Sequence, residues 1–315
     1  MKNQYVLVSL LLALGGFAGE AAAGVRLPTP VRGTSDSDVY LIDSAQELLH
    51  YHLSGTTWSY TVVDHNVTNF QVLGNSSVVL TLRSDTTLWI FNRPGWPSPS
   101  QVDGPGVAQF QALDSMNIFV LGTDGNLWDE VYNYTTRHQV DGSTVAFQLG
   151  NPNYTGGYQG VFVLGNDGNL WEEAYYLNTN FYSSRSQIGP SSNVADFYVD
   201  YSGTNICDNI WYREGNNSLW DYPCSGGKAF EVDTNVSNFE GTGAGVYVLG
   251  TNGTLWSEHW NSGSRTEVDS TVQAFWGMGE YYPNDIVYVL GNDGNLWKET
   301  GTYKNRTHVG ELSDH

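Results

Sequence analysis

One apolar run recurs along the chain at intervals of about forty residues. Its clearest copy is VFVLGNDGNLW at residues 161–171, and six further copies of varying fidelity precede or follow it. Its final tryptophan, or the leucine that replaces it in the most degraded copy, stands at Leu49, Trp89, Trp128, Trp171, Trp220, Trp256 and Trp297. A period near forty with several short strands in each unit predicts an all-β fold, a seven-bladed β-propeller.

Each unit of the repeat contains the signals for four short strands. The run Val-Phe/Tyr-Val-Leu is typical of a strand that is covered on both faces. An Asp-Gly or Asn-Gly pair then closes a two-residue hairpin, and Leu-Trp opens the next strand. A Val-Asp step predicts the end of the outer strand, and a Val/Phe pair predicts the inner strand of the next unit, as in Val63-Asp64 followed by Val67 and Phe70.

The first 23 residues have the pattern of a secretory signal peptide. Lys2 supplies a positive charge, Tyr5–Phe17 is apolar but too short to span a bilayer, and Ala21–Ala23 offers a cleavage site. We therefore expect a secreted, extracellular protein in which residues 24–315 form a single seven-bladed propeller domain.

The net charge of the chain excludes some classes of partner. The formal charge is -20, with 33 acidic and 13 basic residues, and no basic cluster stands out. Such a surface repels phosphate backbones, so we expect no nucleic-acid partner. Beyond the signal peptide there is no second long apolar run, so we expect no membrane insertion.

The two cysteines, Cys207 and Cys224, predict a disulfide bond because exported proteins meet an oxidising environment. They lie at nearly equal distances from the expected hairpin turn at residues 215–217, on facing strands. Their bond would brace the most divergent unit of the repeat rather than carry out redox chemistry.

Eight Asn-x-Ser/Thr sequons follow the signal peptide, and each is a candidate for glycosylation in a host that glycosylates its exports. They are Asn66, Asn75, Asn133, Asn153, Asn216, Asn235, Asn252 and Asn305.

Two charged positions vary together within the repeat. Four units have a glutamate two residues after the tryptophan, and the same four have an arginine near the start of the outer strand. These pairs are Glu130 with Arg137, Glu173 with Arg185, Glu258 with Arg265, and Glu299 with Arg306. The other three units have Tyr51, Phe91 and Tyr222 at the first position and Tyr60, Pro99 and Ala229 at the second. We expect each glutamate to face its arginine across neighbouring strands.

Three interpretations of this pair remain open. It is a surface ion pair worth roughly 0–1 kcal/mol, or it marks the least diverged units, or it belongs to a repeated ligand site. The third fits sugars, which are bound by bidentate arginine, a carboxylate and an aromatic face. Aromatic residues that follow the tryptophans also favour it: Trp58, Tyr60, Trp96, Tyr132, Tyr134, Tyr175, Tyr176, Trp260 and Tyr303. The repeated tryptophan itself is predicted to fill the gap between adjacent blades.

The phrase Val-Tyr-Val-Leu-Gly-x-Asp-Gly-x-Leu-Trp, repeated once per unit, resembles secreted β-propeller lectins of the tectonin type. It has a looser likeness to fungal fucose-binding propeller lectins, whose sites lie between blades and use arginine, glutamate and an aromatic residue. The likeness covers nearly the whole mature chain. It implies ligand-binding sites at Trp128/Glu130/Arg137, Trp171/Glu173/Arg185, Trp256/Glu258/Arg265 and Trp297/Glu299/Arg306.

No catalytic residues stand out in the sequence. The sialidase repeat Ser-x-Asp-x-Gly-x-x-Trp fails because Asp and Gly are adjacent in this chain, and no unique pair of carboxylates suggests another glycosidase. His50 and His52 share one face of an expected strand, but no further metal ligand is near them in sequence. We therefore expect no cofactor and no metal.

The sequence thus predicts a multivalent, non-catalytic carbohydrate-binding protein whose partners are glycans or glycoproteins. Two alternatives remain: an extracellular structural or protein-interaction scaffold, and a glycan-active enzyme on a propeller fold. Neither the sugar nor the oligomeric state follows from the sequence.

Overall fold

The computed structural model describes residues 31–311 apart from 36–37, 43–44, 55–56, 74–77, 94, 96–97, 132–135, 152–158, 177–180, 190–192, 201–204, 243–244, 260–264, 279–285, 294 and 301–304. The predicted signal peptide, residues 1–23, lies outside this part. The described residues form seven four-stranded antiparallel sheets. Packing divides the chain into two compact units, Met1–Ala146 and Phe147–His315, and each is described by itself. None of the described segments is a helix of the length and apolarity needed to cross a membrane.

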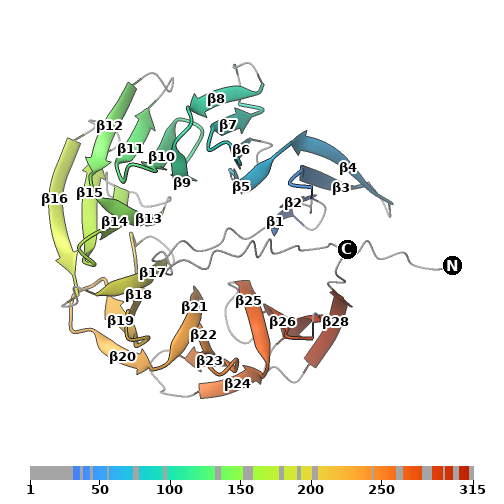
Figure 1. The fold of residues 1–315 in the computed structure, drawn as a ribbon, viewed down its shortest axis with the longest axis vertical. Coiled ribbons are helices and arrows are strands. Elements are labelled where there is room, and N and C mark those ends of the chain that lie inside the picture. Colours follow the sequence, from blue (N-terminus) through green and yellow to red (C-terminus); the bar gives the residue numbers. More distant parts are fainter. Residues whose placement is uncertain are drawn as a thin grey trace. The chain divides into compact units, whose positions relative to one another are not determined.

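In the first unit each sheet takes four strands that are consecutive in the chain (Figure 1). The first sheet contains β1 (Val31–Ser35), β2 (Asp38–Ile42), β3 (Leu48–Ser54) and β4 (Thr57–Asp64). The second contains β5 (Val67–Val72), β6 (Val79–Arg83), β7 (Leu88–Phe91) and β8 (Ser100–Asp103). The third contains β9 (Val107–Ala112), β10 (Asn117–Gly122), β11 (Leu127–Val131) and β12 (Thr136–Asp141).

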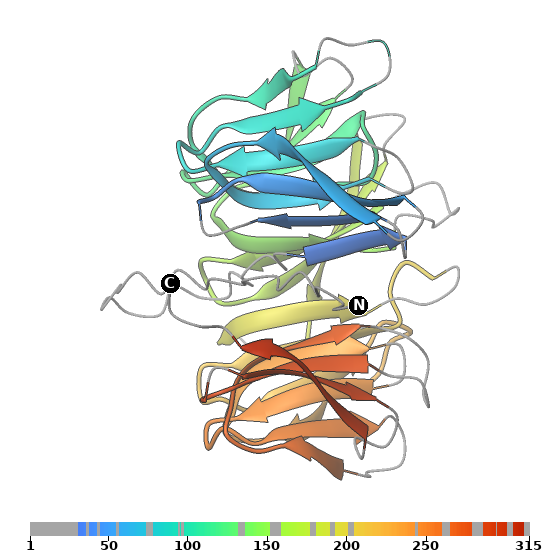
Figure 2. The same ribbon diagram turned by 90° about the vertical axis from the view of Figure 1, so that its right-hand side faces the viewer.

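The second unit contains the remaining four sheets, which run from yellow-green to red in Figure 2. The fourth sheet has β13 (Thr144–Leu149), whose first three residues are counted with the first unit, β14 (Gln159–Gly165), β15 (Leu170–Tyr176) and β16 (Phe181–Ile188). The fifth has β17 (Val194–Asp200), β18 (Asn209–Glu214), β19 (Leu219–Pro223) and β20 (Phe230–Asp233). The sixth has β21 (Val236–Thr242), β22 (Gly245–Gly250), β23 (Leu255–His259) and β24 (Arg265–Asp269). The seventh has β25 (Val272–Met278), β26 (Ile286–Gly291), β27 (Asn295–Thr300) and β28 (Asn305–Glu311).

The predicted order of strand signals is confirmed in these sheets. The apolar run forms the second strand and Leu-Trp opens the third, so that Val120 pairs with Trp128 across β10 and β11. Between them Gly125 has a φ of 79°, the left-handed conformation that the Asp-Gly signal predicted. The Val-Asp step ends the fourth strand at Asp103, and Val107 opens the first strand of the next sheet.

The residue before each repeat position of the tryptophan is fully buried in the core where its side chain is described. Leu48, Leu88, Leu127, Leu170, Leu219 and Leu255 are all 0% exposed. The tryptophans are only half-buried. Trp89 packs against the cluster that joins Leu48 of the first sheet to Val67 and Phe70 of the second, so its predicted place between sheets is confirmed. The fully buried position belongs to the leucine, and the larger indole stays partly exposed.

Within each unit, backbone hydrogen bonds also join neighbouring sheets. In the first unit, Val67 N donates to Gln46 O and Ser84 N donates to Asn66 O. The same two hydrogen bonds recur in the second unit, where Val236 N donates to Asn217 O and Thr251 N donates to Asn235 O. The accepting residues Gln46, Asn66 and Asn217 have φ values of 61°, 56° and 68°. A left-handed residue at each turn therefore points its carbonyl at the neighbouring sheet.

The predicted disulfide between Cys207 and Cys224 is confirmed. The two residues lie just beyond the ends of β18 and β19, with their Cα atoms 5.9 Å apart. Next to the bond, Ile206 O accepts a hydrogen bond from Asn151 N near the end of β13. The disulfide thus braces the hairpin of the fifth sheet and the segment that contacts the fourth.

We expect that Leu88→Ala lowers the free energy of unfolding by roughly 2–5 kcal/mol, because it opens a cavity in a core that has no exposed side to collapse into. The measurement is the midpoint of urea unfolding. Met116→Ala, at a side chain that is 44% exposed, is the control and should change stability by less than about 0.5 kcal/mol. Equal effects of the two substitutions would contradict this assignment of the core.

Removing the disulfide with Cys207→Ser and Cys224→Ser together should lower the free energy of unfolding by roughly 2–4 kcal/mol. The reason is that the closed loop, with a sequence separation of 17 residues, restricts the unfolded chain. Adding a reductant should lower the urea midpoint of the wild-type protein and leave that of the double variant unchanged. A wild-type midpoint that does not respond to reductant would refute this contribution.

Candidate functional site

The predicted facing of glutamate and arginine across the third and fourth strands is confirmed in four sheets. The paired residues are Glu130 with Arg137, Glu173 with Arg185, Glu258 with Arg265, and Glu299 with Arg306. In each pair the arginine Nε lies 3.1 to 3.4 Å from the glutamate Oε1. This pairing follows from the antiparallel register, in which directly opposite residues point to the same face.

Each of these arginines lies over the tryptophan ring of its own sheet. The distance from the guanidinium carbon to the ring centroid is 4.4 Å for Arg137 and Trp128, and 4.0 Å for Arg306 and Trp297. Arg185 and Arg265 lie 4.3 and 4.1 Å from Trp171 and Trp256. Such stacking is a cation–π interaction, and it covers one face of the indole.

In three of the four sheets an aspartate of the preceding sheet adds to the site, and the sequence analysis did not assign it. Arg137 Nη2 lies 3.3 Å from Asp103 Oδ2, and Arg265 Nη2 lies 3.0 Å from Asp233 Oδ2. Arg306 Nη2 is likewise 2.9 Å from Asp269 Oδ2. The signal was the Val-Asp step that ends each outer strand, which was interpreted as a strand boundary only. We call each set of tryptophan, glutamate and arginine an arginine cluster, and the clusters of Arg137, Arg265 and Arg306 include the preceding-sheet aspartate as well.

The members of an arginine cluster differ strongly in exposure. The side chain of Glu130 is 4% exposed and that of Arg137 is 43% exposed. Arg306 and Glu299 repeat this division at 40% and 2%. The glutamate is therefore out of reach of a ligand, and it positions the arginine through the ion pair on the buried side of the guanidinium. What the cluster presents to solvent is the outer face and edge of the guanidinium, next to the aspartate.

Burial sets the protonation of these glutamates. It raises the pKa of Glu130 to about 7, although Arg137 opposes the shift. Burial first and the negative Asp233 second raise the pKa of Glu258 to about 7, again against its arginine. The pKa of Glu299 is also raised by burial. Desolvation outweighs the ion pair because each arginine is shared with a second carboxylate.

The second sheet builds the same arrangement with an arginine from another strand. Arg83, at the end of β6, lies 4.3 Å from the centroid of Trp89. Its Nη2 donates to Asp64 Oδ1 at 2.7 Å, and Asp64 is the residue that ends β4 of the first sheet. The signal in the sequence is that Arg83 stands where four other copies of the repeat have a glycine: Gly122, Gly165, Gly250 and Gly291.

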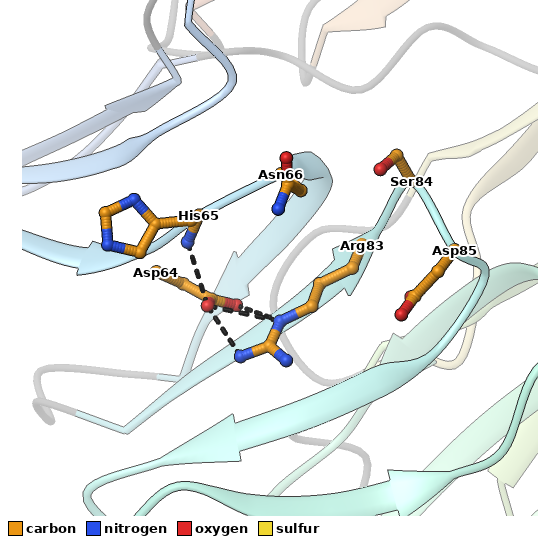
Figure 3. Close-up of a pocket in the computed structure, with 6 residues that line it drawn as sticks. All are labelled: Asp64, His65, Asn66, Arg83, Ser84 and Asp85. Atoms are coloured by element: carbon orange, nitrogen blue, oxygen red, sulfur yellow. Dashed lines mark hydrogen bonds and ion pairs between the residues drawn. The ribbon is translucent and has the colours of Figure 1, made fainter.

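A cavity of about 260 Å³ lies beside this arginine, lined by Asp64, His65, Asn66, Arg83, Ser84 and Asp85. Figure 3 shows the Arg83 guanidinium between Asp64 and the side of the cavity where Asp85 lies. None of these six residues was predicted as a ligand-binding residue from the sequence; Asn66 was predicted as a sequon only.

The fifth sheet departs from the pattern. Tyr222 and Ala229 replace its glutamate and arginine, and among the described residues no arginine stacks on Trp220. In the first sheet Tyr60 takes the arginine position and is 60% exposed. Of the other predicted aromatic residues, Trp96, Tyr132, Tyr134, Trp260 and Tyr303 lie outside the described residues, and Trp58, Tyr175 and Tyr176 are described in their backbone only.

The remaining candidates occupy turns and strands. The sequon residues Asn66, Asn216, Asn235 and Asn252 are exposed, Asn305 is described in its backbone only, and Asn75, Asn133 and Asn153 lie outside the described residues. The His50 ring stacks on Tyr40 with centroids 4.2 Å apart. In the described part of the chain, no group of three or more potential metal ligands comes together.

The raised pKa of Glu258 predicts a pH dependence of stability. Because its pKa in the folded protein lies above the ordinary value of 4.5, the folded state retains a proton that the unfolded chain releases. The resulting stabilisation is present below that ordinary value and is lost as the pH rises through about 7. Urea unfolding at about pH 5 and about pH 8 should show a smaller loss of stability for Glu258→Gln than for the wild type. Equal losses in the two proteins would contradict the assignment.

No family model matches the chain, and no curated protein matches it in sequence. Solved structures match it over most of its length. The C-terminal WD40 domain of Sif2 has 12% identity and a TM-score of 0.57, over 84% of this chain and 78% of that one. Hsv2 of Kluyveromyces lactis has 9% identity and a TM-score of 0.60, over 85% and 91%.

A lectin is also among the similar structures. BP39L from Burkholderia pseudomallei has 13% identity and a TM-score of 0.57, over 88% of this chain and 95% of that one. Identities this low establish the fold alone. Together with the repeat of four-stranded antiparallel sheets, they show that the chain has the β-propeller fold.

Proposed function

We propose that this chain is a secreted, multivalent glycan-binding protein, built as a closed ring of seven blades and lacking a catalytic site. The arginine clusters of Arg137, Arg185, Arg265 and Arg306 are its binding sites. The observation that carries the proposal is the same half-exposed guanidinium, fixed on a tryptophan, in four sheets of one chain.

The chemistry of the cluster suits hydroxyl groups. A guanidinium offers fixed donors in one plane, and the aspartate of the preceding sheet offers acceptors beside it. Because the arginine already covers a face of the indole, a sugar would bond to the guanidinium edge rather than stack on that face. Several weak sites on one chain gain avidity when they engage one glycan surface.

Two further observations support a secreted lectin. The similarity to BP39L extends over 95% of that lectin, so the whole of a sugar-binding propeller is matched rather than a part. The disulfide between Cys207 and Cys224 is typical of proteins that mature in an oxidising compartment. The repeat phrase, which resembles that of tectonin-type lectins, adds to this proposal.

A protein-interaction scaffold is the second candidate, favoured by the similarity to the WD40 domain of Sif2. It predicts no binding to sugars and capture of a protein ligand instead. A glycan-active enzyme would reveal itself by turnover of a polysaccharide.

The test is binding of the mature chain to a glycan array. The variants Arg137→Lys and Arg265→Lys keep the positive charge but lose the planar fork, so each should weaken binding at its own site by about tenfold. Arg213→Lys is the matched control, because Arg213 donates to Asn217 within a hairpin turn and lies outside the arginine clusters. Full retention of binding in a variant with all four arginines, Arg137, Arg185, Arg265 and Arg306, replaced by lysine would eliminate the clusters as sugar sites.

A further inference from the structure

The cavity beside Arg83 has the features of a preorganised binding site. Asp64, which is 5% exposed, accepts hydrogen bonds from Arg83 Nε and Nη2 at 3.0 and 2.7 Å. Its Oδ2 also accepts a 2.6 Å hydrogen bond from the Thr81 hydroxyl, and Trp89 supports the guanidinium from one face. Arg83 is therefore held in one orientation before any ligand arrives.

Several hydrogen-bonding atoms on the wall of this cavity have no partner among the described residues. Arg83 Nη1 is a free donor, since Asp64 engages only Nε and Nη2. Asp85 uses Oδ1 for the amide and hydroxyl of Thr87, which leaves Oδ2 as a free acceptor. The Ser84 hydroxyl and the Asn66 amide line the same cavity (Figure 3). The wall thus combines free donors and acceptors within one small volume.

The charges of the cavity limit what it can hold. The Thr87 hydroxyl holds the pKa of Asp85 below its ordinary value, so this carboxylate is ionised at neutral pH. A phosphate or another anion would meet this charge as well as that of Asp64. A metal cation would meet Arg83, which already occupies Asp64. A neutral ligand with many hydroxyl groups satisfies the free donors and acceptors without either conflict.

We propose that this cavity binds a single sugar ring, at a site separate from the arginine clusters. The inference rests on the proposed glycan-binding function and adds a site of different construction to it. The volume of about 260 Å³ lies just below the range of about 300–1,000 Å³ that is usual for small-molecule pockets, which favours one ring over an oligosaccharide. His65 Nδ1 lies 2.9 Å from Glu47 Oε1. The imidazole therefore lines the cavity, and we do not assign it a hydrogen bond to the sugar.

Asn66 is both a wall residue of the cavity and a candidate glycosylation site. Asn66 begins the sequon Asn66-Val67-Thr68 and is exposed at the cavity. A glycan attached to its amide would cover the cavity and block it. Binding must therefore be measured on protein produced without N-glycosylation.

The experiment is a titration of the unglycosylated mature chain, followed by two-dimensional amide NMR spectra, with glucose, galactose, mannose, fucose and N-acetylglucosamine as separate probes. We expect at least one sugar, with a Kd of roughly millimolar, to shift the amides of residues 64–66 and 83–85. Asp85→Asn keeps the turn but removes the charged acceptor, and Ser84→Leu fills the cavity from an exposed turn. Each should weaken this binding by about tenfold.

Asn66→Gly tests the amide without disturbing the backbone, because glycine accepts the positive φ of 56°. Its matched control is Asn235→Gly, at an exposed residue with a φ of 58° in the equivalent turn of the second unit. The first variant should weaken the sugar-induced shifts and the second should leave them unchanged. Arg83 is not substituted, because its loss would leave Asp64 buried and unpaired.

The outcomes separate this inference from the proposed function. If the glycan array is positive but no sugar shifts the amides around the cavity, the cavity proposal is overturned and the function stands. Unchanged affinity in Asp85→Asn and Ser84→Leu also overturns it. If neither the array nor the titrations detect binding, both proposals fail.

Discussion

The contact on which the candidate sites depend is the ion pair between an aspartate that ends one sheet and an arginine of the next. Asp64 with Arg83, Asp103 with Arg137, Asp233 with Arg265, and Asp269 with Arg306 all follow this rule. The aspartate fixes the arginine over its tryptophan, and the arginine in turn satisfies a carboxylate near the rim of the core. Removing either partner would leave a charge that is costly to bury.

The same geometry is reached by two routes in the chain. In most sheets the arginine comes from the fourth strand and a buried glutamate lies beneath it, as for Arg137 and Glu130. In the second sheet the arginine comes from β6, Phe91 takes the place of the glutamate, and a cavity lies beside the guanidinium. The ion pair between aspartate and arginine is thus formed with an arginine from either of two strands. The chain can therefore carry sites of different shape on sheets that pack in the same way.

Buried glutamates make the clusters sensitive to pH. The clusters of Arg137, Arg265 and Arg306 each hold two carboxylates and one guanidinium, so ionisation of the glutamate leaves one negative charge uncompensated in a poorly hydrated place. A ligand that donates hydrogen bonds to the aspartate would alter this balance. If the clusters bind ligands as we propose, stability and binding are coupled through the same charged groups.

The sequence by itself determined the period, the strand order, the facing of Glu130 and Arg137, and the disulfide, because these depend on neighbours within one hairpin or one repeat. The adjacent sheet decided the rest: which aspartate meets which arginine, that Leu88 rather than Trp89 is fully buried, and that Arg83 replaces a glycine to build a cavity. These features depend on contacts between different sheets. Patterns of period two or forty specify which residues share a face, but they do not specify what lies opposite that face once the sheets pack.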